Sequence, residues 1–345
     1  MEDVASARAL SKAPSRTLSV LLSVVGIWLS LVACRDESSE RLTVVPERVS
    51  ARARPADGNV VESMPAPSRD GVAHLREMTW TFDPGAFGPT DVVVTLPEGA
   101  SPEHRLPVLV ALHGRGESLK GSRRGARGWV DDYELERAMT RLTRPPLAKK
   151  DFQDFVTRDR LRRINRRLGE RPYGGLIVVC PYLPDVLRQD DAFSAAGPLA
   201  EFIVDVLLPE VYQKTPAIGT PATTGIDGVS LGGRAALLIG FTRPQAFGAV
   251  GALQAAVDSS EIGRFVELGE SALAANPTLE LRLLTSDRDH FRRVNEQLAS
   301  ALQRRKVRHQ FLRVTGTHGY RFNRGPGAIE MLLFHDRALR DQPLD

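Results

Sequence analysis

The chain has 345 residues, of which 42% are hydrophobic and 26% are charged, and its formal net charge is +4. This is the composition of a globular protein, and it excludes a chain that is disordered throughout its length. The length suffices for one large α/β domain with additional segments. A charge balance this mildly basic is not evidence for a nucleic-acid partner, and we predict none.

The first 33 residues have the pattern of a secretory signal peptide. Basic residues precede an apolar run over residues 18–31, which is too short for a comfortable membrane span. The run ends in Leu-Val-Ala-Cys at residues 31–34, which resembles the lipobox of bacterial lipoproteins. In that family the cysteine carries a lipid such as palmitate and becomes the first residue of the mature protein. The resemblance implies that Cys34 anchors the protein to a membrane of the bacterial cell envelope, facing outside the cytoplasm.

Two other interpretations of the N-terminus stay open, an ordinary cleavable signal and a membrane anchor formed by the apolar run. Residues 34–76 are rich in Arg, Glu, Ser, Ala and Pro without sustained hydrophobic periodicity, so we predict a disordered tether there. The folded domain is expected over residues 77–345. Cys180 lies in an apolar run and is expected to be a small buried hydrophobic residue rather than a nucleophile.

Strand-like and helical patterns alternate along the folded domain. The expected strands span residues 79–82, 91–96, 107–112, 174–181, 224–227, 247–253, 281–285 and 309–314. Helices are expected over residues 199–208, 234–239, 265–273, 294–302 and 328–339. Several of the strands are continuous apolar runs, as expected for parallel strands that are buried on both faces. The alternation predicts the α/β class, with a mostly parallel sheet and helices on both of its faces.

Residues 117–171 interrupt this alternation, because they contain two helical patterns and no buried strand. The patterns cover residues 132–139 and 151–168, and arginines surround the apolar side of the second pattern. We therefore expect a helical insertion, or lid, after the third strand and beside the rim of the active site. The arginines have two interpretations: a solvated helix face, or a surface for acidic lipid headgroups, lipopolysaccharide or an anionic substrate.

The sequence Gly228-Val229-Ser230-Leu231-Gly232 lies between a predicted strand and a predicted helix. Strand, G-x-S-x-G and helix form the pattern of a nucleophile elbow. A serine on so sharp a turn needs small neighbours, and the two glycines remove Cβ atoms that would clash. The pattern predicts Ser230 as a nucleophile, although chance alone supplies G-x-S-x-G in about one chain in ten of this length.

A serine nucleophile needs a histidine base and a carboxylate that orients it. In hydrolases with this elbow they follow the serine in the order acid, then histidine, each after a later strand. Asp289 follows the seventh predicted strand and His318 follows the eighth, so we predict these two residues as acid and base. Asp287, nearer the same strand, and Asp258, after the sixth strand, stay open as alternatives for the acid.

The oxyanion hole is expected to use two backbone N–H groups. One belongs to Leu231, directly after the nucleophile, and the other to Arg115, after the His113-Gly114 turn that ends the third strand. His113 is expected to have a structural hydrogen-bonding role in that turn. No metal site is predicted, because no further ligands converge in sequence on the acidic loop after the seventh strand.

Together these motifs resemble those of a family of α/β-hydrolases, the esterase D and feruloyl-esterase-like group. The resemblance rests on the His-Gly turn, the elbow around Ser230, the loop of Asp289 and the sequence Gly-Thr-His-Gly-Tyr at residues 316–320. It covers residues 78–339. It implies the α/β-hydrolase fold and a Ser-His-Asp triad without a metal or an organic cofactor.

We therefore predict a serine esterase that cleaves carboxylic esters, carried on a small molecule or a polymer, through an acyl-enzyme. A peptidase or an acyltransferase of the same fold is an alternative within the enzymes. A different class is a surface binding module without catalysis, although such a module has no need of a serine, a histidine and an acid in this order.

Overall fold

The computed structural model describes residues 75–83, 88–185 and 193–340. The chain divides into residues 1–51 and 52–345, and every described residue belongs to the second of these units. The predicted signal peptide, Cys34 and the predicted tether as far as residue 74 lie outside the described residues. Within the described residues, no helix has both the length and the apolar character that crossing a membrane requires.

Eight strands form a sheet in the order β1-β2-β4-β3-β5-β6-β7-β8. Strands β3 to β8 run parallel, whereas β2 pairs antiparallel with both β1 and β4. Each predicted strand overlaps one of them, and the mostly parallel α/β sheet is confirmed. The bounds are β1 (Leu75–Phe82), β2 (Thr90–Pro97), β3 (Val108–Leu112), β4 (Ile177–Pro181), β5 (Thr224–Gly228), β6 (Ala249–Leu253), β7 (Glu280–Arg288) and β8 (Gln310–Thr317).

Both faces of the central strands are buried, which explains their continuous apolar sequences. Side chains alternate between the two faces of a strand. In β3, Val108, Val110 and Leu112 belong to one apolar cluster, whereas Leu109 and Ala111 belong to the other. Each such buried side chain contributes about 1.5–3 kcal/mol, so helices must cover the sheet on both sides.

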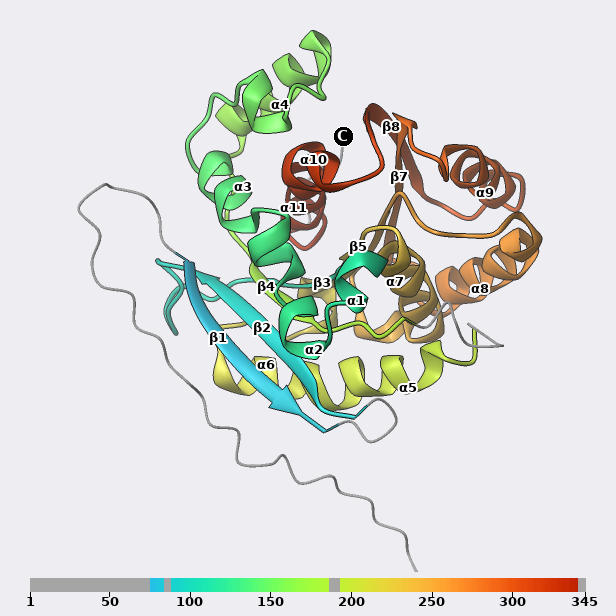
Figure 1. Cartoon of the computed structure of the whole chain (residues 1–345), viewed down its shortest axis with the longest axis horizontal. Coiled ribbons are helices and arrows are strands. Elements are labelled where there is room, and N and C mark those ends of the chain that lie inside the picture. Colours follow the sequence, from blue (N-terminus) through green and yellow to red (C-terminus); the bar gives the residue numbers. More distant parts are fainter. Residues whose placement is uncertain (1–74, 84–87, 186–192, 341–345) are drawn as a thin grey trace, which may run out of the picture. The chain divides into compact units, whose positions relative to one another are not determined.

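Helices cover each face of the sheet (Figure 1). One face packs against α5 (Ala196–Glu201), α6 (Leu208–Lys214), α7 (Leu231–Thr242), α8 (Ile262–Ala275) and α9 (Arg292–Arg304). The other packs against α3 (Leu135–Leu142), α4 (Arg158–Glu170) and α11 (Ala328–Ala338). Short helices are α1 (Arg115–Ser118), α2 (Ser122–Gly125) and α10 (Tyr320–Phe322). Tighter or wider turns span Gly128–Asp132, Lys149–Phe152, Phe202–Leu207, Pro221–Thr223, Pro244–Ala246, Ser259–Glu261 and Asn323–Gly327.

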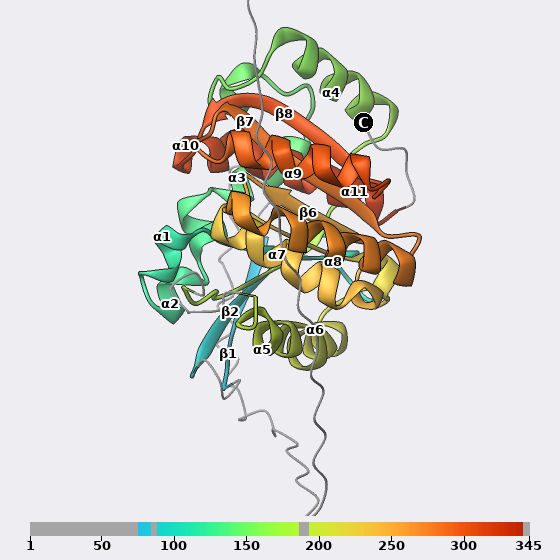
Figure 2. The same cartoon turned by 90° about the vertical axis from the view of Figure 1, so that its right-hand side faces the viewer.

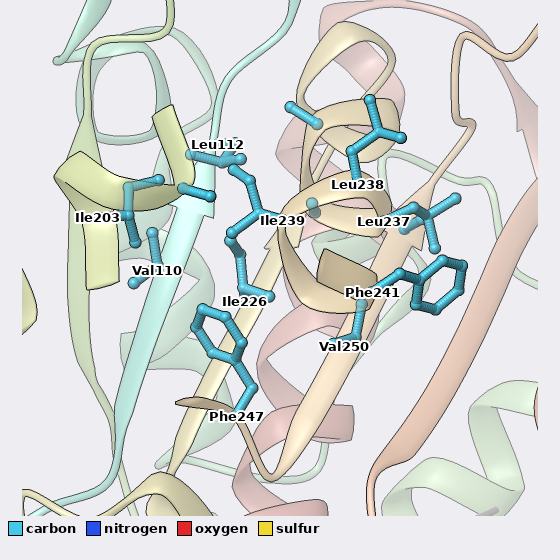
Figure 3. Packing of buried hydrophobic residues seen from close by; sticks show 14 of the residues in the cluster. Val110, Leu112, Ile203, Ile226, Leu237, Leu238, Ile239, Phe241, Phe247 and Val250 are labelled. Atoms are coloured by element: carbon cyan, nitrogen blue, oxygen red, sulfur yellow. The ribbon is translucent and has the colours of Figure 1, made fainter. Parts of the chain in front are cut away.

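Helix α7 is buried along almost its whole length, because its sequence is apolar on every side. Ile239 and Phe241 share one cluster with Val110 of β3, Ile226 of β5 and Val250 of β6 (Figure 3). This packing holds the first turn of α7 directly above the carboxyl end of β5, where the elbow lies.

The insertion between β3 and β4 is helical, as expected, but the single helix predicted over residues 151–168 is wrong. The chain there forms the one-turn 3-10 helix ending at Phe152, and then α4. Gln153 and Asp154 between them have φ angles of 52° and 64°, a left-handed conformation through which an α-helix cannot continue. Thr157 then caps α4, because its hydroxyl accepts a hydrogen bond from the N–H of Arg160.

A buried charge network lies between the sheet and α11. Asp227 of β5 is fully buried, and its Oδ2 accepts a hydrogen bond of 3.2 Å from Arg282 of β7 and one of 3.0 Å from Nε2 of His335 in α11. Burial lowers the pKa of His335 despite the opposing effect of Asp227, so the ring is a neutral donor. Gly251 of β6, the strand between β5 and β7, leaves the space for this carboxylate: a Cβ there would come 1.9 Å from Asp227 Oδ2.

We expect Gly251→Ala to lower the free energy of unfolding by at least about 2 kcal/mol, because the new methyl group displaces a buried carboxylate from its partners. Urea denaturation followed by circular dichroism measures the change. Gly263→Ala is the matched control, since a Cβ at that exposed position of α8 meets no atom within 4 Å. It should not lower the free energy of unfolding, because alanine in place of glycine at an unhindered helix position stabilises by about 0.4–1 kcal/mol. Equal losses in the two variants would show that Asp227 has room to move.

Candidate active site

Ser230 has the backbone of a nucleophile elbow. It lies between β5 and α7 with φ 58° and ψ −115°, a conformation that residues with a Cβ rarely adopt. The flanking glycines permit this turn, because the backbone around it leaves no room for a Cβ atom at either position. A Cβ on Gly228 would come 2.5 Å from the backbone of Gly232, and a Cβ on Gly232 would come 2.3 Å from the carbonyl oxygen of Leu112.

Neighbouring strands hold the backbone of the elbow. The N–H of Ser230 donates a 2.9 Å hydrogen bond to the carbonyl of Leu253, at the end of β6. Its carbonyl accepts hydrogen bonds of 3.0 Å from the N–H groups of Arg234 and Ala256. The strained turn is therefore tied to the helix that follows it and to the next strand of the sheet.

His318 and Asp289 are hydrogen bonded to each other. The distance from His318 Nδ1 to Asp289 Oδ1 is 2.9 Å. Asp289 is buried and also accepts hydrogen bonds from Thr285 Oγ1 at 2.7 Å and from the N–H of Phe291 at 2.9 Å. Burial alone would raise the pKa of Asp289, but the hydrogen bonds from His318, Phe291 and Thr285 outweigh it and hold that pKa below its usual range. Asp289 is thus an ionised acceptor that orients the imidazole.

The two alternative acids have other partners. Oδ1 of Asp287 accepts a 2.9 Å hydrogen bond from the N–H of Gly316. Asp258 is exposed and caps the turn that follows it, through the N–H and hydroxyl of Ser260. Of the three candidate acids, Asp289 is the one that the structure joins to His318.

Ser230, Asp289 and His318 follow the carboxyl ends of β5, β7 and β8, which lie at one edge because these strands are parallel. Among the hydrogen bonds of the described residues, none joins Ser230 Oγ to His318. Contacts of this kind are often long in ligand-free sites and tighten when substrate binds. What the geometry provides is a tight turn carrying a partly buried serine, and an oriented histidine on the same edge.

The two N–H groups predicted for the oxyanion hole lie in the first turns of helices. Arg115 is the first residue of α1 and Leu231 the first residue of α7. Neither N–H has a hydrogen-bond acceptor among the described residues, as is usual for the first turn of a helix. Free N–H groups at helix N-termini are suited to developing negative charge.

His113 has the structural role expected from the sequence. Its Nε2 accepts a hydrogen bond of 2.9 Å from the N–H of Leu183, so Nδ1 carries the proton and donates to the carbonyl of Gly114 at 2.9 Å. Burial lowers the pKa of His113 to about 4, which keeps the ring neutral near pH 7. Cys180 is buried as well, and burial raises its pKa far above the usual range.

Glu117 is a buried carboxylate that the sequence analysis missed. It accepts hydrogen bonds from the hydroxyl of Tyr133 and, at 2.8 Å, from that of Tyr320. Tyr133 in turn accepts a 3.1 Å hydrogen bond from the N–H of Gly114. Burial and the Glu117 charge raise the pKa of Tyr133, which keeps it a neutral hydroxyl. Glu117 therefore links the turn before Arg115 to the loop after β8.

Gln254 is the second residue that the sequence did not indicate. It is fully buried after β6, and its Nε2 donates hydrogen bonds to Ser286 Oγ at 2.7 Å and to the carbonyl of Thr317 at 3.1 Å. The second bond fixes the backbone directly before His318. Neither Gln254 nor Glu117 belongs to a motif, so no pattern of residue types along the chain distinguishes them from surface residues.

The ring of His290 lies beside that of His318, tilted by 44° with the ring centroids 4.1 Å apart. Burial, followed by the charge of His318, lowers the pKa of His290. The ligand atoms of Asp289, His290 and His318 lie within 4.8 Å of one another. Asp289 and His318 already bond to each other, so a metal ion bound here would compete with the orientation of the imidazole.

Comparison with known proteins shows the fold. No protein-family profile matches the chain, and no curated protein matches it by sequence. Among solved structures, a ferulic acid esterase has a TM-score of 0.56 at 18% identity, over 77% of this chain and 99% of that chain. An S-formylglutathione hydrolase from Staphylococcus aureus has a TM-score of 0.55 at 16% identity, over 76% and 100%. A ferulic acid esterase from the fungus Anaeromyces mucronatus has a TM-score of 0.52 at 16% identity, over 79% and 96%.

These similarities extend over nearly the whole length of the neighbours, and the neighbours are α/β-hydrolases. The chain therefore has the α/β-hydrolase fold, which confirms the predicted fold class. At identities below 20% the similarity concerns the fold and does not carry the activity of a neighbour to this chain.

We expect Tyr133→Phe to lower the free energy of unfolding by about 1–3 kcal/mol, because it leaves both Gly114 N–H and the Glu117 carboxylate short of a buried partner. Urea denaturation measures the loss. Tyr320→Phe is the matched control, since it removes a hydroxyl from the same carboxylate at a side chain that is 43% exposed. Water can replace that hydroxyl, so a change below about 1 kcal/mol is expected. The reverse order of the two losses would contradict Tyr133 as the buried connection.

Proposed function

We propose that the protein is a serine hydrolase that cleaves carboxylic esters, with Ser230 as nucleophile, His318 as base and Asp289 as the acid that orients it. The observation that carries the proposal is the hydrogen bond between His318 and Asp289, at the sheet edge where the elbow holds Ser230. Three residue types with complementary roles follow three different strands of that edge, and neither core packing nor solubility requires this arrangement.

In the acylation step, Nε2 of His318 takes the proton of Ser230 Oγ as that oxygen attacks the ester carbonyl carbon. His318 Nδ1 keeps its proton and donates it in the hydrogen bond to Asp289, which stabilises the imidazolium. Negative charge develops on the carbonyl oxygen, and the N–H groups of Leu231 and Arg115 are the donors that would stabilise it. The imidazolium then returns its proton to the departing alcohol, leaving an acyl ester on Ser230.

In the deacylation step, His318 takes a proton from a water molecule that attacks the acyl carbon. Collapse of the second tetrahedral intermediate breaks the bond to Ser230 Oγ, and His318 returns the proton to that oxygen. The carboxylic acid leaves and the enzyme is restored. The buried side chains of Glu117 and Gln254 would keep the segments around the site in position during both steps. Glu117 bonds to Tyr320, and Gln254 bonds to Ser286 and to the backbone directly before His318.

The choice of ester hydrolysis over peptide hydrolysis or acyl transfer is supported by the solved neighbours, which include ferulic acid esterases and an S-formylglutathione hydrolase. The acyl group and the alcohol stay open, since specificity depends on the segments around the active site, and connecting segments vary more between related proteins than the sheet does. Here the first part of the insertion between β3 and β4 supplies Glu117 and Tyr133.

We expect a fluorophosphonate probe to label the wild-type protein and not Ser230→Ala, because the probe reacts with an activated serine hydroxyl. Ser271→Ala, at an exposed position of α8, is the matched control and should be labelled like the wild type. Hydrolysis of a series of p-nitrophenyl esters measures the activity itself. An unlabelled wild-type protein would favour a binding module without catalysis.

The acid is tested by a matched pair of substitutions in the same assay. Asp289→Asn should lower kcat by about 10⁴, the loss associated with removing the triad carboxylate, whereas Asp287→Asn should retain most of the activity. A larger loss in Asp287→Asn would transfer the role of the acid to that residue.

We further propose that a lipid on Cys34 anchors the enzyme to a membrane of the bacterial cell envelope, facing outside the cytoplasm. The support is the sequence at residues 31–34, which lies outside the described residues. Cys34→Ser should move the protein from the membrane fraction to the soluble fraction, because it removes the acceptor of the lipid. Immunoblotting of fractionated cells measures this, and retention of the variant in the membrane would identify the apolar run as the anchor instead.

A further inference from the structure

A cavity of about 380 Å³ lies between the arginine-rich helix α4 and the edge strand β8. Its other walls come from the end of β7, the start of α9, and α11. Figure 2 shows α4 alongside β8. The volume lies within the range of small-molecule sites, which begins at roughly 300 Å³. Ser230 and His318 do not line the cavity.

Four arginines line the cavity: Arg160, Arg163, Arg292 and Arg313. Two of them are already neutralised. Arg160 forms two hydrogen bonds, of 2.9 and 2.6 Å, with the carboxylate of Glu330, and Arg313 pairs with Glu296 at 3.2 Å.

Arg163 and Arg292 differ from the other two. Among the described residues, neither has a carboxylate within 4.0 Å. Asp287 also lines the cavity, but its carboxylate accepts from Gly316 N–H and lies 3.7 Å from Arg288. The cavity therefore presents two guanidinium groups whose charge no protein carboxylate balances.

Helix geometry explains which arginines of α4 reach the cavity. Arg160 and Arg163 are three residues apart and share a face of the helix. Arg162 and Arg166 do not line the cavity, and each has a carboxylate partner on α4, Asp159 for Arg162 and Glu170 for Arg166. The cavity also meets the starts of two helices, at Thr157 before α4 and at Arg292 of α9, and helix N-termini favour anions.

Part of the lining is apolar. Phe152, Phe155, Leu312, Val314 and Pro326 form this part of the wall, and the polar residues Thr157 and Thr315 also line the cavity. An inorganic ion would leave this wall uncovered, whereas a ligand with an apolar body would bury it. A guanidinium group can donate two parallel hydrogen bonds to two oxygens of a phosphate or carboxylate. Arg163 and Arg292 can bind an anion in this way, because neither is paired with a carboxylate of the described residues.

We propose that this cavity binds an organic anion, a phosphate monoester or carboxylate on a small apolar body, with Arg163 and Arg292 holding the charged group. The site is separate from the candidate active site, and the proposal does not rest on esterase activity. It assigns a ligand to Arg292 of α9 and to Arg163, one of the insertion arginines for which the sequence left two interpretations open, a solvated helix face and an anion-binding surface.

Isothermal titration calorimetry of the full-length protein tests the proposal, with phenyl phosphate as the probe. Phenyl phosphate should bind, whereas inorganic phosphate and phenol should each bind at least about tenfold more weakly. Inorganic phosphate lacks the apolar body, and phenol lacks the charged group. In the double variant Arg163→Gln/Arg292→Gln the affinity for phenyl phosphate should fall at least about tenfold. Arg166→Gln, in the same helix but outside the cavity lining, is the matched control and should bind like the wild type.

Three outcomes would overturn the proposal. The first is no binding of phenyl phosphate to the wild-type protein. The second is equal affinity in the wild type and the double variant, which would put the ligand elsewhere. The third is the same loss in Arg166→Gln as in the double variant, because the effect would then reflect the overall charge of α4 and not a site. Circular dichroism of each variant verifies that it is folded before the titration.

Discussion

The close approach of α7 to the end of β3 is the constraint on which the rest of the site depends. No side chain fits at Gly228 or Gly232, because each faces backbone atoms at 2.5 Å or less from an added Cβ. Ser230 is therefore held at a positive φ angle in a tight turn, where it is partly buried. A backbone strained in this way persists when the surrounding structure leaves it no alternative. That support is the burial of α7 in the core of the sheet, together with the hydrogen bonds of Ser230 to the segment around Leu253.

A second constraint is the buried charge of Asp227, on the face of the sheet that packs against α11. Asp227 is surrounded by apolar strands and is stable there because Arg282 and His335 satisfy its carboxylate. Removing a partner from such a buried charge costs about 3–5 kcal/mol, so the three residues fix the distance between the sheet and α11. The network continues outward, since Arg282 also donates to the carbonyl of Glu330, whose side chain binds Arg160 of the insertion. The arginine-rich helix is thereby held against α11 and β8, and the cavity beside it follows from that docking.

At the active-site edge, segments that follow different strands are hydrogen bonded to one another. Glu117, after β3, reaches Tyr320, after β8, and Gln254, after β6, reaches the backbone before His318. Because these contacts are buried or partly buried, loosening one loop would displace the next. Catalytic geometry requires support of this kind, since hydrogen bonds tolerate errors of only a few tenths of an ångström.

Some of this was determined by the sequence alone, because it depends on neighbours along the chain. Strand-like patterns, several of them continuous apolar runs, indicated all eight strands, and the glycines around Ser230 indicated the elbow, since steric exclusion at a turn is local. The sequence also indicated Asp289 and His318 but could not exclude Asp287 or Asp258. Only the tertiary structure showed which of the three carboxylates bonds to His318, broke the predicted helix at Gln153, and gave Glu117 a partner 203 residues away. The physical reason is that a hydrogen-bond partner is chosen by packing, which brings distant residues together without leaving any periodic trace in the sequence.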